Sequence, residues 1–322
     1  MRPFITTTAV ESRANPWAKA EYGRIIRAAK ASRGSVHTMA TGPDDADIIL
    51  FVGCKHIYHA DILASPLFKQ HGEKCMVIDP QDSTIPLLPG LYSCVPSYLK
   101  TVQSYQAYPY LRVFDNQALD RPASQLPNKQ QQFLYSFTGK SSSSPKTRSS
   151  ILQLKDDRAL LKDANTGQTD GCDDYATNLF NSKFVLCPRG YTATTWRIYE
   201  TMRVGRVPVI IADDWLAPRG LPWHTFALQI PEAEIGEIPE KLRHMEARAE
   251  SMGAAAKAAW NEHLSLESCF GWLCNRLGEI DQSKHEHGDQ RRRTRLLEAL
   301  ASKQHRSAFC KEKIFAPAWG QG

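Results

Sequence analysis

The stretch from residue 183 to residue 211 constrains the fold of this chain more than any other. Lys183–Cys187 is a short apolar run that predicts a buried strand, and the Pro-Arg-Gly-Tyr sequence after it predicts a turn. Residues 194–204 predict a helix, Gly205 stands where a helix favours a left-handed residue after its last turn, and Val207–Ile211 predicts a returning strand. A strand, a helix and a strand within about 30 residues form a β-α-β unit, which requires parallel strands.

The same alternation recurs elsewhere in the chain. Residues 47–53 and 75–79 are short apolar runs typical of strands buried on both faces, and residues 17–33 have helical spacing. A second series begins with a strand at 133–137, followed by a helix predicted over 146–161. Strands that alternate with helices indicate α/β domains with parallel sheets.

The chain is long enough for two such domains. It has 322 residues, and residues 122–132, at the end of a Pro-rich stretch, are typical of a linker between domains. We therefore predict an N-terminal domain over residues 1–130, a second domain over 131–280, and a basic C-terminal tail over 281–322.

Charge and composition exclude some classes of protein. The net charge is +6, which suits an anionic ligand or an anionic membrane surface without requiring nucleic acid. No apolar run is long enough for a spanning helix, and Met1–Glu11 contains no apolar core of a secretion signal, so we expect a cytoplasmic protein. The eight cysteines include no C-x-x-C pair, so we expect reduced, buried thiols and no zinc site.

The turn after Cys187 carries the residue types of an anion site. In parallel α/β units ligands bind beyond the carboxyl ends of the strands, at the edge where Arg189 and Gly190 lie. The helix that begins near Thr195 adds backbone N–H groups, and Arg197 adds a second guanidinium. Glu200, one turn along, could accept hydrogen bonds from the hydroxyls of a ribose. The alternative is that Arg197 and Glu200 form an exposed pair at i and i+3.

Three ordered segments in this region resemble the exostosin-type glycosyltransferases. They are Ser182–Gly190, Trp196–Glu200 and Gly205–Trp215, which follow that family's order of strand, Pro-Arg-Gly turn, Arg-x-x-Glu helix and Val-Pro-Val strand. A weaker similarity is Phe137-Thr138-Gly139 followed by Arg148. The resemblance is specific over residues 133–240.

The resemblance implies an inverting glycosyltransferase of the GT-B type, with two Rossmann-like domains whose parallel sheets face a cleft. It implies that the second domain holds a nucleotide sugar, UDP-sugar by family analogy, and that neither a metal nor another cofactor is required. The residues that would bind this donor are Arg148, Arg189, Gly190, Thr195, Arg197 and Glu200. Of these, the arginines would face the phosphates and Glu200 the ribose.

An inverting displacement also needs a base that takes the proton of the acceptor hydroxyl. His56 follows one predicted strand of the first domain, Asp79 ends the next strand, and Asp82 lies in the loop after it; these are the catalytic candidates. For each, the alternative is a polar residue that stabilises its loop. Asp213-Asp214 lacks the spacing of an Asp-x-Asp metal motif, and we interpret it as a loop or helix cap.

We therefore expect transfer of a sugar to a hydroxyl of a glycan acceptor. The first alternative is a GT-B-like module that binds nucleotide without turnover, and the second is a nucleic-acid-associated protein, which the arginines of residues 291–295 suggest. We expect no nucleic-acid partner. If the tail is helical, it either packs back onto the first domain or brings the protein to an anionic membrane. The sequence does not indicate an oligomeric state.

Overall fold

The structure is a computed structural model. It describes residues 1–7, 16–32, 36–52, 59–82, 88–95, 103–120, 132–166 and 172–286. The chain forms two compact units. The first contains Met1–Ile25, Ser35–Tyr108 and the chain from Leu273, and the second contains Ile26–Gly34 and Pro109–Trp272.

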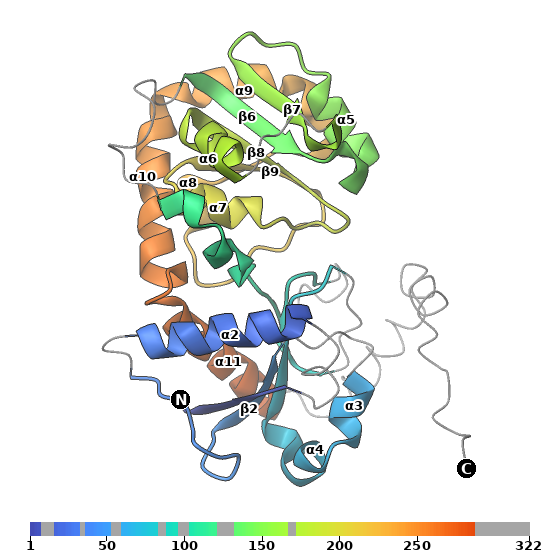
Figure 1. The fold of residues 1–322 in the computed structure, drawn as a ribbon, viewed down its shortest axis with the longest axis vertical. Helices are drawn as coiled ribbons and strands as arrows, with labels where there is room; N and C mark the ends of the chain where they lie inside the picture. Colours follow the sequence, from blue (N-terminus) through green and yellow to red (C-terminus); the bar gives the residue numbers. More distant parts are fainter. Residues whose placement is uncertain are drawn as a thin grey trace, which may run out of the picture. The chain divides into compact units, whose positions relative to one another are not determined.

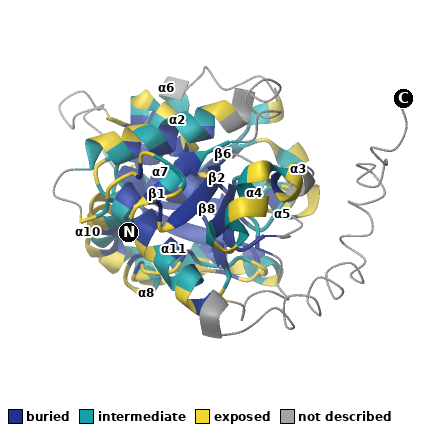
Figure 2. Cartoon of the chain, turned by 90° about the horizontal axis from the view of Figure 1, so that it is seen from below, coloured by how far each residue is buried: buried dark blue, intermediate teal, exposed yellow. Residues whose placement is uncertain are grey.

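The first unit is built on a five-stranded parallel sheet with the order β1-β2-β3-β4-β5. The strands are β1 (Pro3–Thr6), β2 (Ile48–Val52), β3 (Cys75–Asp79), β4 (Gly90–Tyr92) and β5 (Tyr105–Ala107). Every residue of β2 and β3 is buried, as expected for continuous apolar runs in the middle of a parallel sheet (Figure 2). Its complete helices are α3 (His59–Ala64) and α4 (Pro66–His71) (Figure 1). Most of α2 (Pro16–Ala31) and of α11 (Cys269–Glu286) also belongs to this unit, but Ile26–Ala31 and Cys269–Trp272 are assigned to the second.

The second unit contains another five-stranded parallel sheet, with the order β10-β9-β8-β6-β7. Its strands are β6 (Phe133–Gly139), β7 (Ala159–Asp163), β8 (Ser182–Pro188), β9 (Val207–Ile211) and β10 (Leu228–Gln229). Its helices are α5 (Pro145–Leu152), α6 (Cys172–Phe180), α7 (Arg197–Arg203), α8 (Trp223–Phe226), α9 (Ile238–Met245) and α10 (Ala249–Ala259). Apolar side chains of β6, β8 and β9, such as Phe137, Phe184 and Ile211, form its core with residues of α9 and α10.

Short helical turns connect these elements. Those in 3₁₀ conformation are Gly72–Lys74, Leu111–Asp115, Gln117–Asp120, Ser141–Ser143, Ala164–Thr166, Glu232–Glu237 and Glu246–Arg248, and Trp260–Leu264 is a π-helical turn. Two of them, η4 (Leu111–Asp115) and η5 (Gln117–Asp120), belong to the second unit although they precede its first strand. No helix among the described residues is both long and apolar enough to cross a bilayer.

The predicted α/β class with two parallel-sheet, Rossmann-like domains is confirmed by the two sheets. The β-α-β unit is also confirmed: β8 and β9 pair in parallel, with Leu186 opposite Val209. The helix between them is shorter than predicted, because α7 begins at Arg197. At its other end Gly205 has a φ of 70°. Its N–H donates to the carbonyl oxygen of Met202, and the N–H of Arg206 donates to the carbonyl oxygen of Thr201, each over 3.0 Å. These two hydrogen bonds complete the predicted left-handed cap of the helix.

The helix predicted over 146–161 is wrong in its second half. α5 ends at Leu152, and Ala159–Asp163 forms β7, which pairs with β6. β7 is an edge strand whose residues are all half-buried, so its composition lacks the apolar run that revealed the central strands. Pairing with β6 therefore outweighs the local helical tendency of this segment.

The division of the chain also differs from the predicted boundary at 131. The second unit begins at Pro109 and also includes Ile26–Gly34, whereas α11 from Leu273 packs on the first unit. Ser283 of α11 shares a hydrogen bond of 3.3 Å with Ser104. Residues 122–131 of the predicted linker and the arginine-rich part of the tail lie outside the described residues.

Candidate functional site

The candidate site lies at the carboxyl edge of the second sheet. β6, β8 and β9 are parallel neighbours, so their last residues, Gly139, Pro188 and Ile211, share one edge. The turn after β8 is fixed there because the N–H of Arg189 donates to the carbonyl oxygen of Ile211 over 3.0 Å. The sequence placed its anion site at this edge.

Arg197, the first residue of α7, is a buried cation. Its side chain is only 5% exposed, and Nη2 donates to the carbonyl oxygen of Thr138 over 2.6 Å. The guanidinium lies 5.0 Å from the ring centre of Phe137 and 5.8 Å from that of Tyr175. Nε and Nη1 are buried and find no hydrogen-bond acceptor within the described part of the chain. Arg197 therefore holds two unused donors in a dry environment.

Gly139 makes room for this guanidinium. A Cβ atom at position 139 would lie 2.7 Å from Nη2 of Arg197 and 3.1 Å from Cζ of Phe137. The first contact is too short for non-bonded atoms, and the second is tight, so the guanidinium would have to move. The Gly turn after β6 thus has a steric reason: it lets Arg197 reach the end of the strand.

Arg148 of α5 is a second buried cation at the same edge. It is 6% exposed, and it donates from Nε to the carbonyl oxygen of Arg189 and from Nη1 to that of Lys140, each over 2.9 Å. Burial, and then the nearby charge of Arg197, lower the pKa of Arg148 to about 10. Among the described residues neither Arg148 nor Arg197 forms an ion pair with a carboxylate, and both direct hydrogen bonds to main-chain oxygens.

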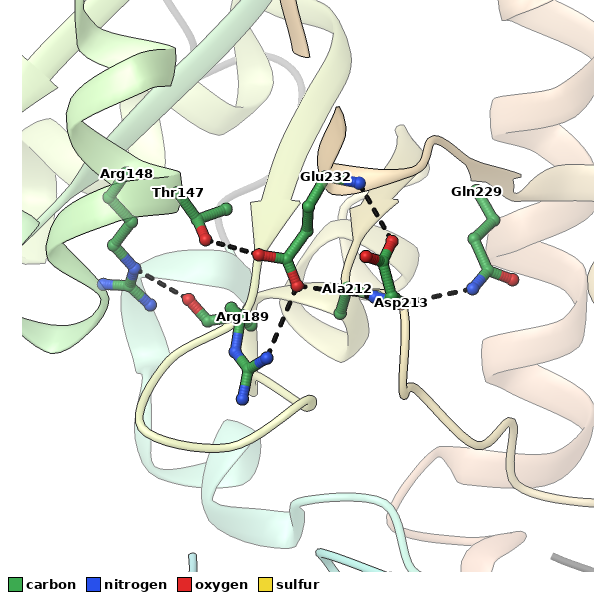
Figure 3. A network of polar contacts seen from close by, with 7 residues as sticks. All are labelled: Thr147, Arg148, Arg189, Ala212, Asp213, Gln229 and Glu232. Carbon is green, nitrogen blue, oxygen red and sulfur yellow. Dashed lines mark hydrogen bonds and ion pairs between the residues drawn. The ribbon is translucent and has the colours of Figure 1, made fainter. Parts of the chain in front are cut away.

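Arg189 has a different environment. Its Nη1 lies 3.4 Å from Oε1 of Glu232, and Oε2 of Glu232 accepts a hydrogen bond of 2.6 Å from Thr147 (Figure 3). Glu232 is held in turn by Asp213, whose Oδ1 accepts from the N–H of Glu232 over 2.9 Å. Arg189 is thus partly exposed and already paired with Glu232. Asp213 serves as the loop cap that the sequence indicated.

Glu200 is buried beside Arg197. It is 5% exposed; Oε2 accepts a hydrogen bond of 2.5 Å from the Tyr175 hydroxyl, and Oε1 accepts one of 3.2 Å from Nδ2 of Asn116. Burial and the neighbouring Glu200 carboxylate raise the pKa of Tyr175 well above its usual range, so this hydroxyl keeps its proton. Because Arg197 and Glu200 are both buried, the alternative of an exposed surface pair is wrong.

Gly190 and Thr195 shape the loop between β8 and α7. The N–H of Gly190 donates to the carbonyl oxygen of Thr192 over 3.0 Å, and a Cβ at position 190 would lie 3.5 Å from Nη2 of Arg148. Oγ1 of Thr195 is 3.5 Å from the N–H of Arg197, a long contact for a helix cap. The donor-side residues predicted from the sequence therefore gather at one edge of one sheet.

The three catalytic candidates belong to the first unit. Asp79, the last residue of β3, is fully buried, and its Oδ1 accepts a hydrogen bond of 3.0 Å from the N–H of Gln81. This contact is what a loop-stabilising carboxylate makes. Asp82 is exposed, and His56 lies outside the described residues. The assignment of a base stays a prediction.

Three residues of the site were not found from the sequence: Asn116, Tyr175 and Glu232. Asn116 lies in a Pro-rich, irregular stretch, and Glu232 follows a strand of two residues, so neither carries a periodic signal. Tyr175 occupies a helix whose apolar residues explain its presence without a site. Within the described ranges, no three His, Cys, Asp or Glu residues are grouped as metal ligands.

Comparison with known proteins shows which domain family this region resembles. Residues 97–245, which contain the whole candidate site from Asn116 to Glu232, match the Exostosin GT47 domain. This match of just under half of the chain is to a domain of exostosin-type glycosyltransferases. The resemblance drawn from the Pro-Arg-Gly turn and the Arg-x-x-Glu helix is thereby confirmed.

Curated relatives of the exostosin domain are similar over short stretches. The Exostosin-1 homolog of Caenorhabditis elegans is 39% identical over 71 residues, which are 21% of this chain and 19% of that protein. The probable glucuronoxylan glucuronosyltransferase IRX7 of Arabidopsis thaliana is 33% identical over 75 residues, 23% of this chain and 17% of that protein. The chain thus spans about a fifth of the length of these relatives.

A solved glycosyltransferase from Rickettsia africae covers more of the chain. It aligns with 88% of this chain and 98% of its own, at 10% identity and a TM-score of 0.49.

Proposed function

We propose that this protein transfers a sugar from a nucleotide-sugar donor, a UDP-sugar in the first instance, to a hydroxyl of a glycan acceptor, with inversion at the anomeric carbon. The exostosin domain supports the reaction class. The nucleotide, the sugar and the acceptor are part of the proposal, as is a reaction that requires no metal ion.

The observation that carries the proposal is the pair of buried guanidiniums, Arg148 and Arg197. Arg197 has two buried donors that find no acceptor among the described residues, and an unsatisfied buried donor costs about 1–3 kcal/mol, more when the group is charged. Arg148 directs its donors to main-chain oxygens only, and its lowered pKa reflects burial beside another cation. A diphosphate at this edge supplies acceptors for the donors of Arg197, and its negative charge complements two cations that form no ion pair within the described residues.

The same pair accounts for the chemistry. When the acceptor hydroxyl attacks the anomeric carbon, the bond to the diphosphate breaks and negative charge develops on the leaving oxygen. Preorganised cations in a dry site stabilise that charge without reorganising. The hydroxyl proton passes to a base, for which His56, Asp79 and Asp82 of the first unit remain the candidates.

The test is binding of pyrophosphate and of UDP, ADP, GDP and CDP by calorimetry, followed by transfer assays with the matching nucleotide sugars. Arg197→Ala should weaken diphosphate binding at least tenfold, because it removes a charge-assisted contact of about 1.5–3 kcal/mol. Arg219→Ala, at an exposed arginine of the same unit, is the matched control. Equal affinity of wild type and Arg197→Ala for every diphosphate would refute the proposal. Activity lost on EDTA treatment and restored by Mn²⁺ would refute its metal-free part.

A further inference from the structure

Glu232 connects three segments at the carboxyl edge of the second sheet. Its Oε2 accepts a hydrogen bond of 2.6 Å from the hydroxyl of Thr147 in α5. Its N–H donates to Oδ1 of Asp213 over 2.9 Å, and its Oε1 lies 3.5 Å from the N–H of Asp213, in the loop after β9. Nη1 of Arg189, in the turn after β8, approaches the same Oε1 (Figure 3). Groups other than Arg189 therefore hold this carboxylate in place.

The contact between Arg189 and Glu232 is a loose one. Charge-assisted N–H···O hydrogen bonds measure about 2.7–2.9 Å, and a bidentate pair uses two nitrogens. Arg189 uses one nitrogen, at 3.4 Å. The side chains are 28% and 21% exposed, and within the described residues this is the one polar contact of the Arg189 guanidinium. An ion pair that solvent reaches is weak, so Arg189 can exchange this partner for another anion.

The main chain of Arg189, in contrast, is fixed. Its N–H donates to the carbonyl oxygen of Ile211 over 3.0 Å, and its own carbonyl oxygen accepts a hydrogen bond of 2.9 Å from Nε of Arg148. The side chain can therefore turn about a fixed main chain. A change of partner at the guanidinium leaves the edge of the sheet in place.

A diphosphate is a better partner for Arg189 than Glu232 is. A guanidinium matches two phosphate oxygens at once, and a diphosphate carries more negative charge than one carboxylate. Its binding to Arg189 nevertheless costs the ion pair with Glu232. The carboxylate also stays beside the bound anion, because Thr147 and Asp213 hold it there. Both effects lower the affinity for the diphosphate.

We propose that Glu232 competes with the diphosphate for Arg189: it holds the guanidinium in the free protein, yields it to the bound diphosphate, and takes it back when the nucleoside diphosphate product leaves. Because the competing ligand is the diphosphate of the donor, this inference rests on the proposed function. It assigns Glu232 to product release, a step that limits the turnover of many enzymes. If Glu232 instead aimed Arg189 at the ligand, removing the carboxylate would have the opposite effect and weaken binding.

The experiment measures the affinities for pyrophosphate and UDP by calorimetry in the wild type, Glu232→Gln, Arg189→Ala and the double variant. Glutamine keeps the size of Glu232 and can still form hydrogen bonds, but it carries no charge. We expect Glu232→Gln to bind both ligands about fivefold more tightly, the size of a partly exposed ion pair. Arg189→Ala should lower the affinity less than about threefold in the wild type and more than about tenfold in Glu232→Gln, because the two residues are coupled.

Asp214→Asn is the matched control. Asp214 is an exposed carboxylate next to Asp213, so this variant removes one negative charge from the same loop. Solvent screens exposed charges, and both affinities should stay within about twofold of those of the wild type. Glu232→Ala, which removes the carboxylate altogether, should tighten binding as Glu232→Gln does. A loss of folding cannot raise an affinity, so tighter binding distinguishes competition from a merely structural role of Glu232.

The outcomes separate this inference from the proposed function. If the wild type binds UDP but both Glu232 variants bind it no more tightly, Glu232 does not compete for Arg189 and only this inference falls. It falls as well if Asp214→Asn tightens binding equally, or if Glu232→Gln still tightens binding when Arg189 is alanine, since the cause is then net charge. If neither the wild type nor Glu232→Gln binds pyrophosphate or any nucleoside diphosphate, the proposed function falls with it.

Discussion

Nε of Arg148 donates a hydrogen bond to the main-chain carbonyl oxygen of Arg189, over 2.9 Å. One arginine of the candidate site thus holds the backbone of another. The side chain of Arg189 is meanwhile paired with Glu232. The three arginines that the sequence offered as phosphate ligands therefore differ. Two donors of Arg197 lack an acceptor among the described residues, Arg148 holds the main chain as well as carrying charge, and Arg189 pairs with Glu232.

The arginines should accordingly differ in their effect on diphosphate binding. Arg197→Lys keeps the positive charge but loses the planar guanidinium, which can contact two phosphate oxygens at once. We expect the affinity for nucleoside diphosphates to fall at least about tenfold. Arg189→Lys should reduce it by less than about threefold, because Glu232 already satisfies that cation. Calorimetric titration of both variants checks this order. A larger loss in Arg189→Lys than in Arg197→Lys would reverse the assignment.

Gly139→Ala should impair ligand binding more than folding. The new Cβ would lie 2.7 Å from Nη2 of Arg197, so the guanidinium must leave the carbonyl oxygen of Thr138. We expect nucleoside diphosphate affinity to fall about tenfold, the size of a displaced charged contact, with a modest loss of stability. The control is Gly236→Ala, where an added Cβ meets no atom within 4 Å. Unchanged affinity in Gly139→Ala would show that Arg197 does not need this position to bind.

Gly205→Ala tests the helix cap rather than the ligand site. A φ of 70° is strained for residues with a Cβ, so the substitution should lower the free energy of unfolding by about 1–2 kcal/mol. Gly205→Asn should lose less, because asparagine tolerates the left-handed region better. Urea denaturation of the three proteins gives the comparison. Equal stability of the alanine variant and the wild type would mean that the turn relaxes to a negative φ.

Glu246 should make stability depend on pH in the acid range. Its Oε1 accepts hydrogen bonds from Arg158 and Lys183, which lower the pKa of Glu246 from 4.5 to about 2. Because the folded pKa lies below the unfolded one, the contribution is complete above pH 4.5 and is lost as pH falls towards 2. Glu246→Gln should therefore be less stable than wild type at pH 7, and the difference should shrink below pH 4.5. Denaturant titrations of both proteins at pH 7, 5, 4 and 3 measure this difference in the free energy of unfolding. A difference that stays constant over these pH values would disprove the prediction.

The strands that could be predicted share one property: each is a run of consecutive apolar residues. β2, β3, β8 and β9 are apolar runs because both faces of a central parallel strand are covered. The edge strand β7 is only half-buried, so no such run marks it. The predicted domain boundary missed residues 109–120 for a related reason. These residues are tied to the second unit by hydrogen bonds from Arg203, which lies more than 80 positions away along the chain.

The sequence by itself determined the β-α-β unit and the edge of the sheet at which its arginines and Glu200 lie. The order of strand, turn, helix and strand along the chain is enough for this. In a parallel sheet the turn and the first turn of the helix must lie at the carboxyl ends of the strands. Only the tertiary structure decided which of those charges are satisfied. Glu232 reaches Arg189, Tyr175 and Asn116 reach Glu200, and nothing among the described residues reaches two of the donors of Arg197. Each partner lies at least 25 positions from the charge it meets, and pairing over such separations depends on packing rather than on local pattern.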